Sequence, residues 1–241
     1  MQNDFVNGKI SVITGASAGI GAAIAKKLAA MGSRCILIAR DPSRLKKVQD
    51  EIAAAGGKAE SHPCDLSDAD QIEKLTRTLL QAHARCDILV NNAGIGSFGS
   101  PLHLTDLAEW ERTIAINLRA PYLLLRAFAP GMIAARSGHI INISSLASKN
   151  PVPNAAAYAA SKWGLNGMMV SAAEELRQYQ VRVSLIAPGS VQTGFGSGLA
   201  AQKSSLGAIQ PEDIAEIVAL LASQADQSFI SEVLVRPTLK K

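Results

Sequence analysis

Several residue classes are scarce in this sequence of 241 residues, and each shortage excludes a kind of protein. Charged residues make up 18% and hydrophobic residues 48%, which excludes a disordered chain, because such chains are polar and highly charged. Aromatic residues reach only 4%, so the core must consist mainly of aliphatic side chains and alanine. Glycine (19) and proline (10) lie near ordinary usage, which excludes collagen-like and low-complexity chains.

The sequence also lacks long runs of basic residues and long runs of apolar residues. Lysine and arginine total 24 against 20 acidic residues, and neighbouring basic residues form the isolated pairs 26–27, 46–47 and 240–241. A nucleic-acid surface needs clustered basic residues, so we expect no nucleic-acid partner. The uncharged stretch 10–25 is too rich in glycine for a signal peptide, and no segment has the length and apolarity of a membrane span. We therefore expect a cytoplasmic protein without membrane association.

The cysteines and histidines indicate no metal site. Cys35, Cys64 and Cys86 do not lie at metal-ligand spacing from one another or from a histidine. We interpret them as buried reduced thiols, which fits a reducing compartment. The four histidines share no mutual spacing, and we interpret them as surface residues or as residues with satisfied hydrogen bonds.

Short β-rich runs alternate with helix-length segments along the chain. Strands are predicted at residues 9–14, 34–39, 58–64, 87–91, 138–144, 181–187 and 230–235. Helices are predicted to begin at Gly19, Pro42, Asp68 and Pro211, to cover 106–135 with a break or kink at Pro121, and to cover 154–179 with Asn154 as cap. Continuous apolar strands of this kind are typical of parallel strands covered on both faces.

This order predicts one α/β domain over residues 1–241. Its fold is a doubly wound parallel β-sheet (Rossmann fold) of about seven strands, with helices on both faces. The stretch 194–207, rich in glycine and serine, is predicted to be a substrate-binding loop within the domain.

A glycine-rich loop, TGASAGIG at residues 14–21, follows the first predicted strand and opens the first helix. Gly15 permits a tight turn, Gly19 lets a phosphate approach the backbone, and Gly21 lets helix and strand pack closely. The exposed N–H groups and the helix dipole then favour a pyrophosphate, which predicts a dinucleotide site. The alternative is an ordinary glycine-rich turn. No Lys-Ser or Lys-Thr pair follows, so the loop is not that of a nucleoside-triphosphate-binding protein.

The residue that ends the second strand selects the dinucleotide. Proteins that bind the unphosphorylated form place a carboxylate there for the ribose 2′-hydroxyl, whereas this chain has Ala39 followed by Arg40. A guanidinium can pair with a 2′-phosphate, so NADP(H) is the predicted cofactor and NAD(H) remains possible. The alternative is a solvated arginine at a strand end.

Tyr158 and Lys162 lie four residues apart, which places both side chains on one helix face. A nearby ammonium favours the phenolate and lowers the tyrosine pKa, so the pair is a candidate proton donor and acceptor. Tyr122 and Arg126 have the same spacing without a glycine loop or a serine partner, and we interpret that pair as structural.

Together with further motifs in the expected order, these signals resemble the short-chain dehydrogenase/reductase family of NAD(P)-dependent oxidoreductases. The resemblance covers nearly the whole chain and includes Asp65-Leu66, the sequence NNAG at 91–94, and the segment that begins at Pro188. It implies cofactor contacts from Gly15, Ser17, Gly19, Ile20, Gly21, Arg40, Asp65, Leu66, Asn92, Ala93, Gly94, Tyr158, Lys162, Pro188, Gly189, Val191 and Thr193.

The same resemblance implies four catalytic residues. Tyr158 would be the general acid/base, Ser145 would bind the substrate oxygen, and Lys162 would lower the tyrosine pKa and bind the nicotinamide ribose. Asn117 would hold a water of a proton relay. The implied function is hydride transfer between NADP(H) and a small carbonyl or alcohol substrate, in a homo-oligomer that is more often a tetramer than a dimer.

Two departures from the family pattern keep alternatives open. The chain ends in Arg236-Pro237-Thr238 instead of the Asp-Gly-Gly segment of 3-oxoacyl-acyl-carrier-protein reductases, and Ala18 stands where many NADP(H) members carry a basic residue. A reductase of that type remains one alternative. A non-catalytic dinucleotide-binding regulatory protein is another, because a fold alone does not imply a function.

Overall fold

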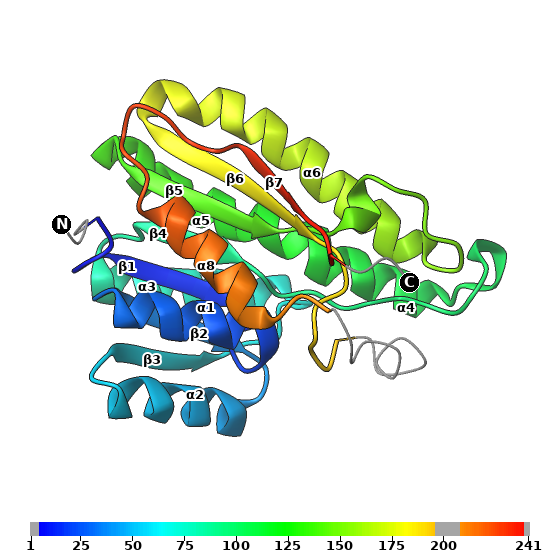
Figure 1. Ribbon diagram of the computed structural model, residues 1–241, viewed down its shortest axis with the longest axis horizontal. Helices are drawn as coiled ribbons and strands as arrows, with labels where there is room; N and C mark the ends of the chain where they lie inside the picture. The colour runs from blue at the N-terminus through cyan, green and yellow to red at the C-terminus, as the bar shows by residue number, and fades with distance from the viewer. Residues whose placement is uncertain (1–4, 196–207, 239–241) are drawn as a thin grey trace.

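The computed structural model describes residues 5–195 and 208–238, which form a seven-stranded sheet between two layers of helices (Figure 1). All strand pairs are parallel, in the order β3-β2-β1-β4-β5-β6-β7. The strands are β1 (Ile10–Thr14), β2 (Arg34–Ala39), β3 (Lys58–Pro63), β4 (Ile88–Asn91), β5 (Gly138–Ile143), β6 (Val181–Pro188) and β7 (Glu232–Val235). The predicted doubly wound α/β fold is therefore confirmed.

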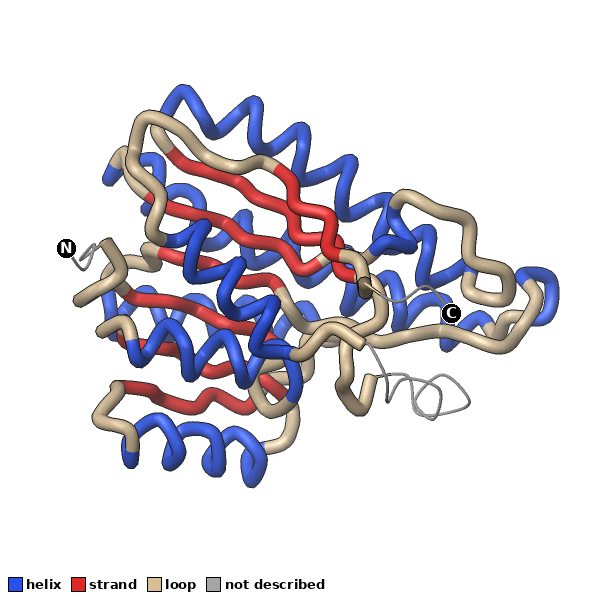
Figure 2. Tube along the Cα trace, viewed as in Figure 1, coloured by secondary structure: helices blue, strands red, loops and turns tan. Residues whose placement is uncertain are grey.

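Helices lie on both faces of the sheet (Figure 2). They are α1 (Gly19–Ala30), α2 (Pro42–Ala54), α3 (Ala69–His83), α4 (Leu107–Ile114), α5 (Ala120–Ala135), α6 (Ala156–Leu176) and α8 (Pro211–Ala222), with short helical turns η1 (Leu102–Leu104), η2 (Ala115–Arg119), η3 (Leu146–Ser148) and η4 (Arg177–Tyr179). One core layer contains buried residues of α1, α2 and α8, and the other contains those of α3, α5 and α6. Among the described helices, none is both long and apolar enough to cross a membrane.

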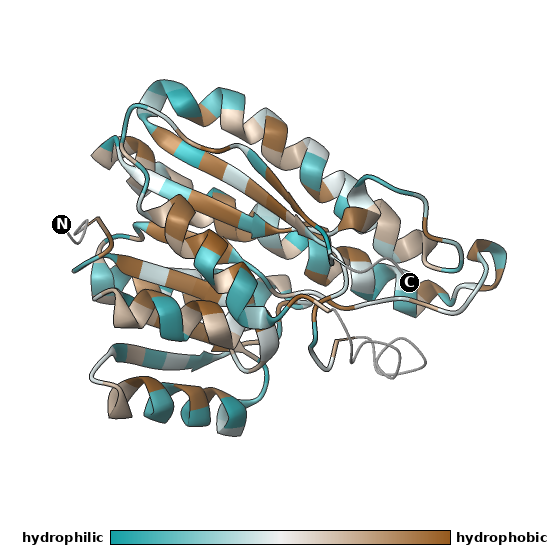
Figure 3. Cartoon of the chain, in the orientation of Figure 1, coloured by the Kyte–Doolittle hydropathy of each residue, from teal (hydrophilic) through white to brown (hydrophobic). Residues whose placement is uncertain are grey.

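Alternation along the strands explains the two core layers. Val12 and Ile36 pack on the α3/α5/α6 side, whereas their neighbours Ile13 and Leu37 pack on the α1/α2/α8 side. Successive strand residues point to opposite faces, so a strand covered on both sides must be apolar at every position. The edge strand β3 is only partly buried and is drawn mostly in hydrophilic colours in Figure 3.

Three expected element boundaries were wrong. The helical stretch 106–135 changes at the π-helical turn η2, which ends at Arg119, and α5 then continues through Pro121. Pro121 has no N–H to donate to the turn before it, and that turn is the π-helical one. Asn154 does not cap α6: its φ is +58°, whereas a capping residue has extended backbone, and the cap position is Ala155. The last strand begins at Glu232 and not at Ile230. The end of the helix agrees with the expectation, because η4 continues α6 from Arg177 to Tyr179.

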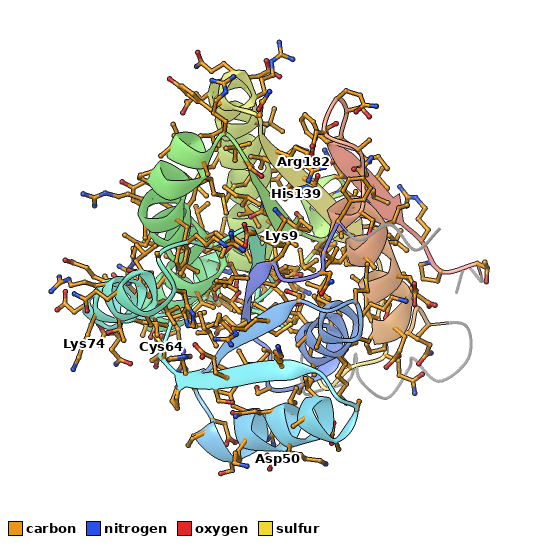
Figure 4. All side chains as sticks on the ribbon, turned by 90° about the vertical axis from the view of Figure 1, so that its left-hand side faces the viewer. Lys9, Asp50, Cys64, Lys74, His139 and Arg182 are labelled. Atoms are coloured by element: carbon orange, nitrogen blue, oxygen red, sulfur yellow. The ribbon has the colours of Figure 1, made fainter. Side chains whose placement is uncertain are left out.

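Buried polar side chains link β5 to β6. His139 and Arg182 are register partners on these strands and lie close together in Figure 4. The ring Nε2 of His139 lies 2.8 Å from Ser184 Oγ, and that hydroxyl donates to the carbonyl oxygen of Ile230 at 2.6 Å. These contacts place the His139 ring and the Ser184 hydroxyl in one buried polar chain that ends at Ile230. Burial lowers the pKa of His139 to about 3, so the ring is neutral at pH 7.

Candidate active site

The predicted site residues gather at the carboxyl ends of β1, β4, β5 and β6. In a doubly wound sheet this edge, at the point where the strand order reverses, is where ligands bind. Here the order reverses between β1 and β4. Thr14 joins these strands: its Oγ1 accepts the N–H groups of Asn92 and Ala93, both at 3.0 Å, and donates to the carbonyl oxygen of Val90 at 3.3 Å.

The glycine-rich loop has the backbone that its sequence predicts. Gly15 and Gly19 have φ of +66° and +53°, a region that other residues rarely adopt. A Cβ on Gly21 would overlap the carbonyl oxygen of Gly15, so the first turn of α1 packs directly against the loop. A Cβ on Gly19 would lie 3.0 Å from Thr193 Cγ2, which places Thr193 against the same turn.

The start of α1 fits a phosphate group. Asp41, Asp68 and Asp106 cap the helices that follow them, each accepting two backbone N–H groups. Helix α1 has no side-chain cap and no acidic residue in its first turn. The first N–H groups of a helix need an acceptor, and the helix dipole favours a negative one. Ser17 and Ile20 belong to this segment, so the residues that are present fit the pyrophosphate of a dinucleotide.

The predicted cofactor contacts Arg40, Asp65 and Leu66 lie just after β2 and β3. Ala39 is buried, and Arg40 is exposed directly after it. Asp65 Oδ1 accepts both the N–H and the hydroxyl of Ser67, at 2.9 and 2.8 Å, so Asp65 also acts as a turn residue. The backbone N–H of Ser67 holds the pKa of Asp65 below its usual value, and the Arg40 charge adds a smaller lowering. Leu66 is buried beside it.

Tyr158 and Lys162 lie on the buried face of α6. The Lys162 Nζ is 5.9 Å from the centre of the Tyr158 ring and donates to the carbonyl oxygen of Ile143, at the end of β5, at 2.9 Å. Ser145 follows β5, and its Oγ accepts the N–H of Ala147 at 3.1 Å, which leaves its own proton available for donation. The segment after β5 and the helix α6 thus bring the serine, tyrosine and lysine together.

The electrostatics differ from the expectation for the tyrosine. Burial raises the pKa of Tyr158 above its usual value, and a hydrogen bond with Ser145 lowers it by less. Burial lowers the pKa of Lys162 to about 8. The expected lowering of the tyrosine pKa by Lys162 is therefore not found. The cause is the loss of water around the hydroxyl, which disfavours the phenolate.

Asn117 lies in the π-helical turn η2. Its Oδ1 accepts the N–H of Ile95 at 2.8 Å, and its Nδ2 donates to the Ile95 carbonyl oxygen at 2.9 Å and to Ser161 Oγ at 3.0 Å. A Cβ on Gly94 would lie 3.3 Å from Asn117 Oδ1 and 3.6 Å from Lys162 Nζ, so both side chains reach the same place. The π-turn thus anchors the segment that follows NNAG.

The segment after β6 carries the last predicted cofactor contacts. The Gly189 N–H donates to the carbonyl oxygen of Val235 at 2.8 Å, and Val191 pairs with Ile209 in an isolated parallel bridge. A Cβ on Gly189 would lie 2.9 Å from Pro237 Cδ, so the unusual chain end packs directly against Pro188-Gly189. The predicted substrate loop, residues 194–207, lies outside the described residues except for Gly194 and Phe195.

Sequence reasoning missed several residues at the site. Ser161 donates to the Tyr158 carbonyl oxygen at 2.7 Å and accepts from Asn117, but nothing in its spacing indicates this. Asn166 accepts the Ser144 hydroxyl at 2.5 Å, beside Ser145. Phe98 and Phe195 lie against Tyr158, and only the three-dimensional fold brings these distant positions together.

A doubly wound sheet, an uncapped glycine-rich helix start and a Ser-Tyr-Lys cluster define a dinucleotide-binding oxidoreductase. Residues 9–204 match the family model described as short chain dehydrogenase, and the chain belongs to that family. Its membership makes it a dehydrogenase/reductase. Among the described residues, no group of three histidine, cysteine or acidic side chains could hold a metal ion.

Individual relatives agree with this assignment. A solved structure, a metagenomic short-chain oxidoreductase in complex with NADP, is 64% identical with a TM-score of 0.87 and covers 98% of this chain and 100% of that chain. A 3-oxoacyl-[acyl-carrier-protein] reductase of Synechocystis is 34% identical, over 92% of both chains. A short chain dehydrogenase of Pseudocercospora fijiensis is 40% identical over 80% of this chain, which spans 62% of that protein's length.

Proposed function

We propose that this chain is an NADP(H)-dependent carbonyl reductase/alcohol dehydrogenase. The observation that carries the proposal is the meeting of Ser145, Tyr158 and Lys162 beside the glycine-rich loop. When bound, the nicotinamide supplies the hydride that reaches the carbonyl carbon, or accepts it in the reverse direction.

Tyr158 is the proton donor in reduction. It passes its hydroxyl proton to the carbonyl oxygen as that oxygen gains negative charge, and solvent then restores the proton. Because burial raises its pKa, Tyr158 is protonated at pH 7, which is the form that reduction requires. Alcohol oxidation needs the phenolate, so the chain favours reduction near neutral pH and oxidation at alkaline pH.

Ser145 and Lys162 assist Tyr158 from either side. The Ser145 hydroxyl, with its lone pair already engaged by Ala147, donates to the developing oxyanion. Lys162 is an ammonium at pH 7, held by the Ile143 carbonyl oxygen, and binds the nicotinamide ribose. Asn117 keeps its proposed place in the proton relay because it faces Gly94 together with Lys162, while its amide fixes the Ile95 backbone.

The preference for NADP(H) over NAD(H) rests on Arg40. Its guanidinium is exposed at the end of β2, and Ala39 offers no carboxylate for a ribose hydroxyl. The 64% identical oxidoreductase whose structure contains NADP supports the same choice.

Reduction of a 3-oxoacyl-acyl-carrier-protein is a second candidate function. The similarity to the Synechocystis reductase over 92% of both chains favours it. The different chain end at Arg236-Pro237-Thr238 argues for small carbonyl compounds instead, because Pro237 packs against Gly189 beside the site. Assay of an acetoacetyl thioester in the same panel as simple ketones separates the two.

Further features support a cytoplasmic homo-oligomer built from one domain. Cys35, Cys64 and Cys86 are buried and free, which suits a reducing compartment. One sheet gathers strands from both ends of the chain, which supports a single domain over residues 1–241. Exposed apolar side chains on α5 and α6 favour self-association, with a tetramer as the proposed state.

The test is turnover of a panel of aldehydes, ketones, 3-hydroxy acids and sugar alcohols, followed by nicotinamide absorbance. Tyr158→Phe should reduce kcat by about 100-fold or more and leave NADPH affinity nearly unchanged, because only the proton-donating oxygen is lost. Tyr122→Phe is the matched control and should behave as wild type. Wild-type kcat in Tyr158→Phe would disprove the mechanism, and a panel without turnover would favour a non-catalytic dinucleotide-binding protein.

A further inference from the structure

Three aromatic rings from separate segments meet at the proposed catalytic tyrosine. The centre of the Tyr158 ring lies 5.1 Å from that of Phe98 and 6.0 Å from that of Phe195, and the two phenylalanine rings are 6.4 Å apart. Rings at these separations attract one another in tilted and edge-to-face arrangements. Tyr158 is buried, whereas Phe98 and Phe195 keep 46% and 42% of their surface exposed within the part of the chain that the structure describes.

Backbone contacts hold each phenylalanine in place. A Cβ on Gly96 would overlap the Phe98 ring, so only glycine there lets the ring lie against the backbone. The Gly99 N–H donates to the Asn154 carbonyl oxygen at 2.8 Å, which ties this segment to the start of α6. The Phe195 N–H donates to Thr193 Oγ1 at 3.2 Å. The rings are thus fixed by the segments after β4 and β6, the neighbours of β5.

Exposure of these two rings differs from that of a core aromatic residue. Phe128 is only 2% exposed, as expected for a side chain that contributes to folding by burial. Phe98 and Phe195 instead leave much of their surface open beside the proton donor. An aromatic group that binds there gains ring-to-ring contacts as well as burial, because aromatic pairs attract beyond the area that they bury.

We propose that Phe98 and Phe195 form the aromatic wall of the substrate site, and that the substrate class is a ketone or aldehyde with an aromatic ring close to the carbonyl carbon, or the matching alcohol. This inference rests on the proposed function. The Tyr158 ring lies beside both phenylalanine rings, which also lie beside each other. A substrate whose oxygen reaches the Tyr158 hydroxyl therefore has its nearby carbon substituents against Phe98 and Phe195.

The test compares 4-phenyl-2-butanone with 4-cyclohexyl-2-butanone, with NADPH as reductant. Two methylene carbons separate each ring from the carbonyl, so the intrinsic reactivity of the two ketones is matched and the rings have similar size. We expect kcat/KM to favour the phenyl compound by about two- to tenfold, the range of an aromatic pair. In Phe98→Leu/Phe195→Leu the ratio should fall towards one, because leucine keeps apolar bulk but has no ring.

Phe5→Leu is the matched control. Phe5 is 40% exposed and precedes β1, so it lies at the amino ends of the strands, whereas the site lies at their carboxyl ends. The phenyl-to-cyclohexyl ratio of kcat/KM in Phe5→Leu should therefore equal that of wild type. The ratio is internal to each variant, so a general loss of activity cancels. The single variants Phe98→Leu and Phe195→Leu serve the same purpose if the double variant does not fold.

Binding gives a second readout. The non-reducible amides 3-phenylpropanamide and 3-cyclohexylpropanamide, titrated calorimetrically with NADP⁺ present, should show the same order of Kd. A wild-type ratio at or below one, or a ratio unchanged in the double variant, would overturn the inference. An altered molar mass of the double variant with an unchanged ratio would assign the rings to a protein contact and overturn it as well. Turnover without phenyl preference leaves the proposed function standing, and absence of any turnover in the whole panel counts against that function itself.

Discussion

At the scale of single residues, burial determines the protonation states of Tyr158, the proposed proton donor, and of Lys162 beside it. It raises the pKa of Tyr158 and lowers the pKa of Lys162 to about 8, because the charged form of each group is the one that needs water. Both groups are thus in the form that reduction needs at pH 7. The Lys162 ammonium is kept in an unfavourable environment for this purpose.

Lys162→Met should therefore make the protein more stable and less active. Between pH 8 and the ordinary lysine pKa of 10.5, the unfolded chain binds a proton at this site that the folded chain does not. The free energy of unfolding of the wild type consequently rises with pH across that window. At pH 7 methionine should add about 1–3 kcal/mol, the burial cost less the lost hydrogen bond to Ile143.

Denaturant unfolding at pH 7 and pH 10, beside kcat, measures this effect. The gap between wild type and Lys162→Met should shrink at the higher pH. Lys149→Met is the control, since Lys149 is partly exposed and paired with Glu232 at 2.9 Å, and it should give no gain. A variant that is less stable than wild type at pH 7 would show that Lys162 is not held at a cost.

Arg40 carries the second prediction at this scale. A 2′-phosphate without Arg40 would lose a charge-assisted contact, worth about 1.5–3 kcal/mol or roughly tenfold to a hundredfold in affinity. Ala39→Asp with Arg40→Leu should reverse the NADPH preference, because the new carboxylate repels phosphate and accepts the ribose hydroxyl. The measurement is kcat/KM with NADPH and NADH. An NADPH preference that survives the exchange would contradict the role of Arg40.

At the scale of elements, the contact between α1 and the glycine-rich loop carries the next prediction. In Gly21→Ala the new methyl group would overlap the Gly15 carbonyl oxygen, so we expect a loss of about 1–3 kcal/mol in stability and weaker NADPH binding. Gly131→Ala is the control: it lies in α5, on the side of the helix away from Tyr122, with open space around it, and should stabilise by roughly 0.5–1 kcal/mol. Thermal unfolding and NADPH titration report both, and equal behaviour of the two variants would refute the packing argument.

The sequence predicted those elements whose signals are local. Asp68 and Pro42 mark helix starts through capping and fixed φ, and the structure has both helices starting there. Asn154 carried the same capping signal, but the prediction from it was wrong. Its carbonyl oxygen accepts the N–H of Gly99 instead, and its backbone has a positive φ. The π-turn around Asn117 depends on hydrogen bonds to Ile95, which are invisible in one dimension.

In the candidate site, too, local features could be predicted from the sequence and features that depend on distant segments could not. The glycine-rich loop and the Tyr158–Lys162 spacing follow from local geometry and are read directly from the chain. The direction of the Tyr158 pKa shift depends on burial by distant segments, and the sequence gives no measure of it. Phe98 and Phe195 are almost a hundred residues apart, so their meeting is a product of the strand order.

At the scale of the whole molecule, the apolar surface of the helices is larger than one sheet face requires. Trp163 on α6 and Tyr122 on α5 are exposed, and α5 and α6 cover the same side of the sheet. Exposed apolar groups on neighbouring helices are typical of protein contacts. Closed symmetric assemblies then bury the same surface on every copy.

We therefore predict a homo-oligomer at micromolar concentration, a tetramer of about four times the 25.3 kDa chain mass. Val170→Lys places a charge on α6, where Val170 is 57% exposed, and should lower the mass measured by light scattering, since a charge is costly in an apolar contact. Leu220→Lys is the matched control on α8, on the other side of the sheet, where Leu220 is 59% exposed, and should leave the mass unchanged. Both positions face water within one chain, so neither substitution should alter folding of the monomer by more than roughly 0.5 kcal/mol. A monomeric wild type would refute self-association, and equal dissociation by both variants would place the contact elsewhere than on α6.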